Sequence, residues 1–447
     1  MATATAALLL AACGGGSGDA GDGPKDEGRE SGKGGRQEVG GGSGRGGSGG
    51  SGQDAPQAPE IRVPPSFDTT RGWVVQDSPV APLHAPHAGA LVFRAGTAGG
   101  ALRVEARDLR SGTRRWTGEK VETPVAGSGG PGLKPEMFMT SRDGKDYAVV
   151  GASGKLAGDG AAEAKEVTRF AVYPVASRST RRTARIIDVP GRVRPGGYAV
   201  QDNGLAFVQQ GARAFAVDLV TGRRTALKDS DLAAPAGAAA CGGPAADCGA
   251  APRIEAMTPH GPLVGGGGAY WRGGAGGWHS DDHRPAGARA DGDASIVAYL
   301  GGRIVSRWTA RTGGGHVIAL QDARTGEVEA ATPCEADSGA HGRDGAGGGP
   351  RLSDGGTYLT VGSTAFQLKE KKAYCSTAEG RAALPLAGVD AEDGSAYGTR
   401  SGTPVTVLLS KGAAKPLREG TQVPTMIAGR HGIFPQKDHR VIVYPLR

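Results

Sequence analysis

The densest group of side chains able to do chemistry is the segment WHSDDHRP. It holds His279, Asp281, Asp282 and His283 within five consecutive positions. Two imidazoles and two carboxylates are a ligand set that a divalent metal ion accepts. The same residues also suit a solvated turn in a glycine-rich region, and nothing in the pattern would hold the ligands in one orientation. We therefore expect a polar turn here and assign no metal ligand.

Other patterns of this kind are weaker. His84 and His87 lie in a proline-rich loop, and the acidic turns 141–146, 228–231 and 290–293 lack the ladder of ligands with a closing Glu that a calcium loop needs. The sequence has no HExxH motif, no GxxxxGK[S/T] loop, and no GxSxG motif between a strand and a helix. It therefore predicts no catalytic residue, no cofactor and no metal.

Of the five cysteines, one lies near the start of the chain and four lie in the later part. An even number of cysteines such as these four is typical of a protein in an oxidising compartment. Cys241 and Cys248 lie in a Gly/Ala/Pro loop that can bend enough to bring their Cα atoms within disulfide range. A metal site is the alternative there, but it usually has Cys-x-x-Cys spacing and further ligands. Cys334 and Cys375 form the second expected pair, and their disulfide would close a longer loop.

The remaining cysteine, Cys13, ends the segment MATATAALLLAAC. This segment resembles a bacterial lipobox, in which small residues precede a cysteine that is lipidated and becomes the mature N-terminus. Its apolar run is too short to span a bilayer and fits the core of a signal peptide. No Lys or Arg precedes the run, so we expect the true start codon upstream. An alanine-rich start of a cytosolic protein is the alternative.

Residues 14–60 have the composition of a tether. They include 19 glycines and no aromatic residue, so they cannot bury enough apolar surface to fold. A flexible glycine-rich chain of this length reaches roughly 35–40 Å. We expect residues 1–13 to be a lipoprotein signal, residues 14–60 a disordered linker and residues 61–447 the folded domain.

One motif recurs through this domain. Segments of similar sequence contain Asp108 with Gly112, Asp218 with Gly222, and Asp322 with Gly326, so the aspartates are 110 and 104 residues apart. Alternating apolar residues before each aspartate predict a half-buried strand, and Asp-x-x-Ser/Thr-Gly predicts a hairpin turn in which Gly adopts positive φ. A spacing near 105 corresponds to two units of about 50 residues each, a length typical of propeller blades.

The motif resembles the quinoprotein-type (PQQ-like) β-propeller repeat, whose signature is Ala-x-Asp-x-x-Thr-Gly-x-x-x-Trp. The first copy matches from Ala106 to Trp116 with Ser111 in place of Thr, and the later copies lack the Trp. The resemblance implies a propeller whose Trp residues pack between blades. Quinoprotein enzymes hold their cofactor on the propeller axis, but this chain lacks their adjacent-cysteine pair, and a shared fold does not imply shared chemistry.

The predicted fold is therefore an all-β, seven- or eight-bladed β-propeller of four-stranded antiparallel blades. Short apolar runs such as 90–95, 146–152, 204–210 and 316–322 alternate with Gly, Asp, Asn and Pro turns, which favours many short strands. The chain ends on a strong strand at 441–444, which must be paired. We expect the segment 61–75 to complete the last blade and close the ring.

Charge is uninformative about partners. The net charge is +7, but no run of five or six like charges occurs, which disfavours nucleic-acid binding.

The sequence favours a non-catalytic, monomeric binding or scaffolding propeller, lipid-anchored on the outer face of a bacterial cytoplasmic membrane with a protein partner in the envelope. The alternatives are a quinone-cofactor dehydrogenase or carbohydrate-active enzyme, and a ligand-binding sensor.

Cys13→Ala tests the anchor. Without the thiol no acyl group can be attached, so the protein should leave the membrane fraction and appear in the medium or remain unprocessed. Immunoblotting of fractionated cells measures this. Membrane association that still requires detergent after the substitution contradicts lipidation at Cys13.

Overall fold

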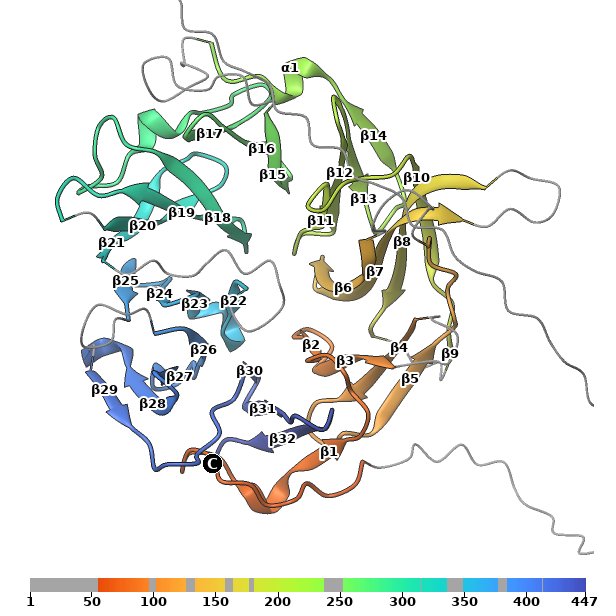
Figure 1. Cartoon of the computed structure of the whole chain (residues 1–447), viewed down its shortest axis with the longest axis vertical. Coiled ribbons are helices and arrows are strands. Elements are labelled where there is room, and N and C mark those ends of the chain that lie inside the picture. Colours follow the sequence, from red (N-terminus) through yellow and green to blue (C-terminus); the bar gives the residue numbers. More distant parts are fainter. Residues whose placement is uncertain are drawn as a thin grey trace, which may run out of the picture. The chain divides into compact units, whose positions relative to one another are not determined.

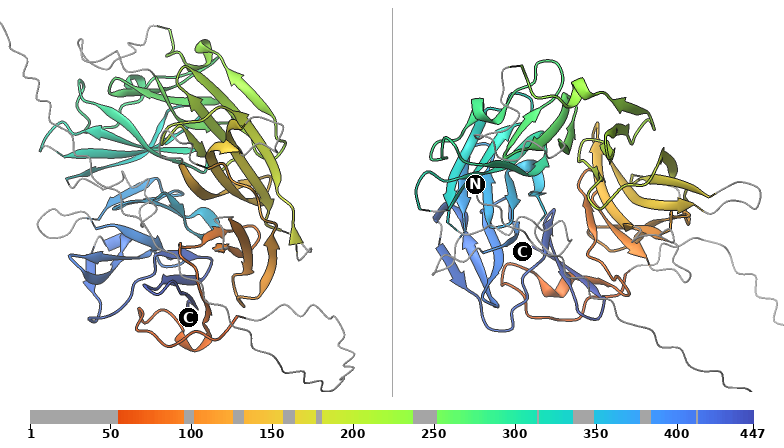
Figure 2. Two further views of the ribbon diagram at one scale, coloured as in Figure 1. Left: turned by 45° about the vertical axis from the view of Figure 1, so that its right-hand side comes forward. Right: turned by 45° about the horizontal axis from the view of Figure 1, so that its top comes forward.

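A computed structural model describes residues 55–95, 102–125, 133–156, 164–176, 181–236, 252–313, 315–335, 349–376, 384–411 and 413–447. All of them belong to one compact unit, Ser51–Arg447. Within this unit eight β-sheets form the blades of a ring, seen end-on in Figure 1 and tilted in Figure 2. The fold is an eight-bladed β-propeller, so the prediction of a propeller is confirmed and the blade number is eight.

The first four blades follow each other along the chain. Blade 1 comprises β2 (Leu83–Ala85), β3 (Ala90–Ala95), β4 (Arg103–Asp108) and β5 (Arg114–Gly118), with β9 (Arg181–Arg182) beside β5; blade 2 comprises β6 (Leu133–Arg142), β7 (Lys145–Leu156), β8 (Lys165–Pro174) and β10 (Arg185–Pro190). Blade 3 comprises β11 (Tyr198–Val200), β12 (Leu205–Gln210), β13 (Arg213–Asp218) and β14 (Arg224–Leu227), followed by helix α1 (Asp229–Leu232); blade 4 comprises β15 (Arg253–Thr258), β16 (Gly261–Gly266) and β17 (Ala269–Arg272).

The other four blades complete the circle. Blade 5 comprises β18 (Ala294–Leu300), β19 (Arg303–Thr309), β20 (His316–Asp322) and β21 (Val328–Cys334); blade 6 comprises β22 (Arg351–Leu352), β23 (Tyr358–Val361), β24 (Thr364–Gln367) and β25 (Lys372–Cys375). Blade 7 comprises β26 (Leu386–Val389), β27 (Ser395–Arg400), β28 (Thr403–Leu408) and β29 (Ala413–Pro416); blade 8 comprises β30 (Met426–Ala428), β31 (His431–Pro435), β32 (Val441–Pro445) and β1 (Trp73–Val75). Short 3₁₀ helices are η1 (Thr69–Arg71), η2 (Ser280–His283), η3 (Asp354–Gly356) and η4 (Leu409–Lys411).

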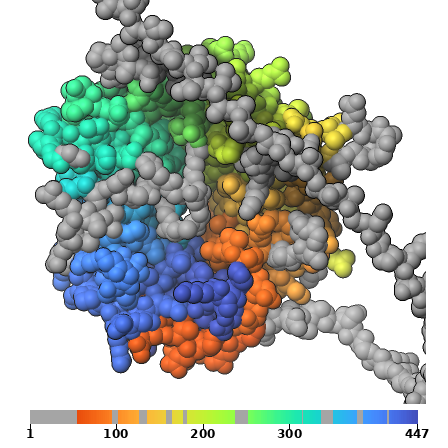
Figure 3. Space-filling model, viewed as in Figure 1, coloured from red at the N-terminus to blue at the C-terminus, as the bar shows by residue number. Residues whose placement is uncertain are grey.

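The ring closes as the sequence predicts. β1 pairs antiparallel with β32, with Trp73 opposite Val443, so the start of the domain supplies the outer strand of the last blade. Figure 3 shows the first and last parts of the domain, in red-orange and dark blue, side by side on the surface. Residues 55–60 already take part: Ala58 is buried, and Pro59 O accepts a hydrogen bond from Tyr444 Oη. The packed region therefore starts a few residues before the predicted boundary at residue 61.

The core is divided among the blade interfaces. In the described part of the chain, eight buried clusters each combine residues of two neighbouring blades, one cluster for each interface of the ring. Blade 4 has three named strands, and an isolated bridge between Trp271 and His279 takes the place of the fourth. Because each blade buries its two faces only against its neighbours, the apolar burial that stabilises the domain requires the closed ring.

The three repeated aspartates each close the turn between the third and fourth strands of a blade. Oδ1 of Asp108 accepts hydrogen bonds from the backbone N–H groups of Arg110 (3.0 Å) and Ser111 (2.9 Å), and Asp218 and Asp322 bind the same two positions of their own turns. The glycines Gly112, Gly222 and Gly326 have φ of 70°, 83° and 79°. Each aspartate thus fixes its turn, and each glycine supplies the left-handed conformation that closes it.

Tryptophan side chains connect successive blades at these turns. The indole N–H of Trp73 on β1 donates to Leu109 O of blade 1 (3.1 Å), and that of Trp278, beside the outer edge of blade 4, donates to Ala323 O of blade 5 (3.3 Å). Trp116 on β5 donates to Val175 O of blade 2 (2.8 Å) and stacks on Tyr173. Each of these three indoles therefore satisfies its N–H at the turn of the next blade.

The turn glycines also leave space for these rings. A Cβ added to Gly112 would lie 2.6 Å from Cδ2 of Trp73, and one added to Gly326 would lie 2.7 Å from Cδ2 of Trp278. At Gly222, where no Trp docks, the nearest atom would be 3.7 Å away, on Arg185. Gly112 and Gly326 thus meet two requirements, positive φ and close approach, whereas Gly222 meets only the first.

Gly112→Ala and Gly222→Ala separate the two requirements. Positive φ should cost each variant about 1–2 kcal/mol, and the contact with Trp73 should cost Gly112→Ala about 1–3 kcal/mol more. Thermal unfolding midpoints of the two purified variants measure the difference. Equal midpoints would show that the indole adapts and that the glycine serves conformation alone.

Candidate functional site

A cleft in the described part of the chain has a volume of about 920 Å³. It opens on the face of the ring that carries the first and third turns of each blade, which we call the turn face. Turns of blades 1, 6 and 8 meet there with the chain ends that flank β1 and β32. Its lining is Arg71, His84, Pro86, His87, Ala88, Gly89, Asp108, Leu109, Arg110, Arg115, Asp354, Gly429, Arg430, His431, Pro445 and Leu446.

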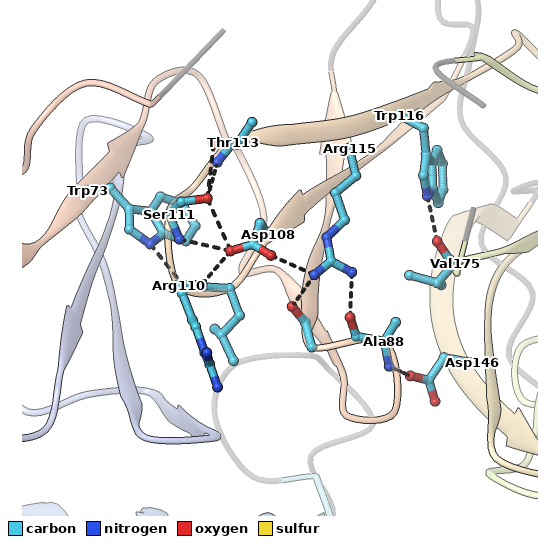
Figure 4. A network of polar contacts seen from close by, with 12 residues as sticks. Trp73, Ala88, Asp108, Arg110, Ser111, Thr113, Arg115, Trp116, Asp146 and Val175 are labelled. Carbon is cyan, nitrogen blue, oxygen red and sulfur yellow. Dashed lines mark hydrogen bonds and ion pairs between the residues drawn. The ribbon is translucent and has the colours of Figure 1, made fainter. Parts of the chain in front are cut away.

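The Asp108 turn forms one wall, shown in Figure 4. The guanidinium of Arg115 donates to Oδ2 of Asp108 (2.6 Å), to Gly89 O (3.1 Å) and to Ala88 O, so it joins the first and third turns of blade 1. Partial burial opposes ionisation of Asp108, but the hydrogen bonds from Arg115 and Ser111 prevail and lower its pKa. This wall is therefore a fixed, ionised arrangement.

A buried aspartate orients His87 at the edge of the cleft. Asp146, 1% exposed, accepts hydrogen bonds from Ala88 N (2.8 Å), Ser141 Oγ (2.6 Å) and His87 Nδ1 (2.8 Å). A carboxylate only accepts, so Nδ1 of His87 carries the proton and the ring's Nε2 is left as the nitrogen for other partners. The His87 side chain is 49% exposed, which makes this nitrogen accessible from the cleft.

His84 and His431 are more deeply placed. Burial, reinforced by the charge of Arg110, lowers the pKa of His431 to about 4, and its Nδ1 is buried without a hydrogen-bond partner in the described structure. Burial also lowers the pKa of His84, against the opposing charges of Asp354 and Asp146. Both imidazoles are therefore neutral at pH 7.

Asp354 reaches the cleft from blade 6, past blade 7. Its Oδ2 would lie 3.7 Å from a Cβ added to Gly429, and Cδ2 of Leu109 would lie 3.1 Å from the same point. Blade 6 is tied to its neighbours by the half-buried Arg351, which donates to Ala387 O of blade 7 (3.2 Å) and to Thr425 O, next to β30. These bonds hold η3, and Asp354 with it, against the turns of blade 8.

A second, smaller cleft of about 450 Å³ lies on the same face, among the turns of blades 3, 4 and 5. Asn203 Nδ2 donates there to Met257 O (3.0 Å) and to Tyr299 Oη (3.2 Å), and the carboxylate of Asp202 accepts from Gly301 N. Burial raises the pKa of Asp202. Because its polar groups mostly bond one another, this cleft presents fewer free groups than the larger one.

The histidine-aspartate segment has a packing role. His279 is 1% exposed and stacks on Trp271, and His283 makes an edge contact with Trp278. Asp281 pairs with Arg284 (2.8 Å). In the described ranges, no three His, Cys, Asp or Glu side chains are grouped so as to hold a metal ion. The segment fills the outer edge of the three-stranded blade 4.

The cysteine predictions are resolved in part. Cys334 on β21 and Cys375 on β25 form a disulfide with Cα atoms 5.7 Å apart, so this prediction is confirmed. The bond links the outer strands of blades 5 and 6. Cys13, Cys241 and Cys248 lie outside the described residues.

The structure brings together residues that the sequence left separate. His84 and His87, weak candidates in the sequence, share the cleft with His431 and with Arg110 of the first repeat. The sequence signal for this grouping was ring closure, which places the last blade beside the first. Asp146, by contrast, has no local motif.

No protein-family model matches the chain, and no curated protein matches it. Solved structures that it resembles include dipeptidyl peptidase 4 of Porphyromonas gingivalis (8% identity, TM-score 0.38, covering 80% of this chain and 56% of the peptidase). Rhamnogalacturonan lyase PL11 of Bacillus licheniformis is 12% identical, with TM-score 0.38 and coverage of 88% and 75%. The Dos1 propeller is 8% identical, with TM-score 0.33 and coverage of 83% and 94%. These likenesses concern the fold alone.

Among the described residues, no helix is long and apolar enough to cross a membrane.

The low pKa of His431 predicts a pH dependence of stability. As pH falls below about 6.5, the unfolded chain binds a proton at this ring, whereas the folded chain does so only near pH 4. The stabilising contribution is therefore full above pH 6.5 and is lost progressively towards pH 4. His431→Asn should lose less stability than the wild type between pH 7 and pH 4.5, by about 1 kcal/mol after allowance for solvent screening.

Thermal midpoints across this pH range measure the effect, with His439→Asn, at an exposed turn of blade 8, as the control. An unchanged pH profile in His431→Asn would mean that the ring titrates alike in both states.

Proposed function

We propose that this protein is a non-catalytic binding or scaffolding propeller, lipid-anchored through Cys13 on the outer face of a bacterial cytoplasmic membrane. The observation that carries the proposal is the cleft of about 920 Å³ on the turn face. Concave sites with a few convergent polar groups are where proteins hold ligands and partner side chains. The cleft is built from turns on a rigid ring, which is how binding surfaces are commonly assembled.

The chemistry of the cleft favours binding. Its described lining supplies arginines, histidines and aspartates but no serine, threonine, cysteine or lysine. The oxidising environment that the Cys334–Cys375 disulfide needs agrees with export. The lipobox-like segment and the resemblance to the quinoprotein-type repeat support an exported propeller tethered by residues 14–60, with an envelope protein or a small ligand as its partner.

A carbohydrate-active enzyme is the second candidate, and the His87–Asp146 pair favours it. A histidine held at Nδ1 by a buried carboxylate is arranged as a general base, with Nε2 towards the substrate. Such an enzyme would transfer a proton at the cleft. A sensor that binds a small ligand and reports to a membrane partner uses the same cleft without chemistry.

Photo-crosslinking in intact cells tests the binding proposal. A benzophenone amino acid replaces Pro86, an exposed residue of the cleft, and in the control it replaces Arg213, an exposed residue that follows the second turn of blade 3 on the opposite face. We expect a reproducible adduct with one cell-envelope component from position 86 only, identified by mass spectrometry of the membrane fraction. Equal adducts from both positions, or none from position 86, contradict an envelope partner that binds at the cleft.

A further inference from the structure

The four arginines of the cleft differ in the partners they already have. Three are committed: Arg71 to Asp68 (2.7 Å), Arg115 to Asp108 (2.6 Å), and Arg430 to Glu392 and to Arg447 O. The guanidinium of Arg110 has no hydrogen bond or ion pair with any residue in the described ranges. In Figure 4 its side chain points away from the Asp108 turn. Arg110 is thus the cleft's cation without an internal counter-ion.

The backbone beneath Arg110 is rigid. Its N–H donates to Oδ1 of Asp108 (3.0 Å), and the turn closes with Gly112 N donating to Asp108 O (2.9 Å). The same carboxylate is fixed on its other side by Arg115. The base of the Arg110 side chain therefore needs little further ordering when a ligand binds, which reduces the entropic cost of binding.

Three imidazoles face the same space with unused nitrogens. Nε2 of His87 is free because Nδ1 is held by Asp146, and Nδ1 of His431 is buried without a partner in the described structure. His84 also lines the cleft and makes no hydrogen bond with a described residue. An orphaned buried nitrogen is costly unless a ligand or solvent completes it.

The donors that remain unpaired set the sign of the ligand. Four arginines and two aspartates line the cleft, but Arg71 and Arg430 pair with Asp68 and Glu392 outside it and Arg115 pairs with Asp108. Among the described residues, the charges left without a partner of this kind are those of Arg110 and Asp354. Guanidinium and protonated imidazole groups are donors only, and their preferred acceptors are carboxylate and phosphate oxygens. A group with several anionic oxygens therefore complements the donors of this cleft.

We propose that the cleft binds the acidic group of a small ligand, a carboxylate or a phosphate, between the guanidinium of Arg110 and the imidazoles of His84, His87 and His431. This inference rests on the proposed function, because it names the ligand chemistry of the same cleft. Asp354 lines the same cleft, makes no hydrogen bond or ion pair with a described residue, and accepts from a hydroxyl or amine elsewhere on the ligand.

Binding is coupled to proton uptake. Burial first, and the nearby cations after it, hold the pKa of His431 low. The charged and titratable groups that face His431 come from five elements around it, and a bound anion offsets the cations among them. They are Arg71 of η1, His84 of β2, Asp108 and Arg110 of the β4–β5 turn, Asp354 of η3, and Arg430 of its own turn. Protonation of His431 therefore accompanies binding, and affinity rises as the pH falls.

Titration of the full-length protein with sulfate and with acetate tests the proposal, because sulfate keeps its charge and acetate stays largely ionised between pH 5.5 and pH 7.5. Sulfate represents a phosphate group and acetate a carboxylate. Isothermal titration calorimetry at constant ionic strength, made up with chloride, gives the affinity, and buffers of different ionisation enthalpy give the proton uptake. We expect one probe to bind more tightly at pH 5.5, with net proton uptake.

Arg110→Gln should weaken this binding about tenfold, as expected for loss of a charge-assisted hydrogen bond. Arg213→Gln is the matched control, since Arg213 is also an exposed turn arginine without a partner among the described residues, on the opposite face. It should bind as the wild type does. Sulfate selectivity would identify a phosphate-bearing ligand and acetate selectivity a carboxylate.

The proposal fails if neither anion binds beyond chloride at either pH, or if Arg110→Gln binds as the wild type does. Thermal midpoints without anion show whether each variant is folded. This failure is distinct from that of the binding function. An adduct from position 86 without anion binding would leave the module a binder of another ligand, and anion binding without an adduct would leave the site but remove the envelope partner.

Discussion

The antiparallel pairing of β1 with β32 is the contact on which the rest of the structure depends. Without it blade 8 would have three strands, an exposed edge and no tryptophan to dock on blade 1. The same pairing brings the first turn of blade 8 beside the first and third turns of blade 1. The cleft exists only in the closed ring, because its histidines come from both ends of the domain. Closure thus determines stability and site together.

A second constraint acts at the repeated turns, where one glycine serves two purposes. At Gly112 the chain needs positive φ, and the indole of Trp73 occupies the place a side chain would take. The turn is consequently fixed from within by Asp108 and from outside by the preceding blade. Arg110 extends from this doubly fixed turn. A motif that serves blade packing therefore also positions the cation that we assign to ligand binding.

Much of the fold could be predicted from the sequence because its signals are local. Alternating apolar residues specify strands, and the Asp-Gly turns mark blades 1, 3 and 5. The intervening blades are less visible because they use other turns: in blade 2, Pro174 precedes the carbonyl that Trp116 binds, where blade 1 has Asp108. A related turn in blade 7, closed by Asp390 and Gly394, joins the first and second strands of its blade and so does not follow the spacing of the repeat. Confirmation of the Cys334–Cys375 pair follows from the adjacency of consecutive blades.

The cleft could not be read in the same way, because its chemistry arises from juxtaposition. His87 in a proline-rich loop gives no local signal, and its significance comes from Asp146, a buried carboxylate in the next blade. The sequence predicted closure, and that prediction already implied that loops of the first and last blades meet. A site formed by these loops could therefore have been predicted from closure of the ring.

The electrostatics of the cleft favour an exchange of partners upon binding. A buried imidazole beside an arginine is held neutral, which is unfavourable for its nitrogen unless something accepts from it or donates to it. A directly bonded carboxylate would relieve this, as Asp146 does for His87, yet no carboxylate among the described residues makes a hydrogen bond or ion pair with His431 or Arg110. An acidic ligand supplies the missing charge from outside. The ligand accepts hydrogen bonds from the guanidinium of Arg110 and raises the pKa of the His431 imidazole. The protonated imidazole is then a second donor to the ligand. The cost of the unpaired nitrogen in the empty cleft is thereby removed, and this contributes to the free energy of binding.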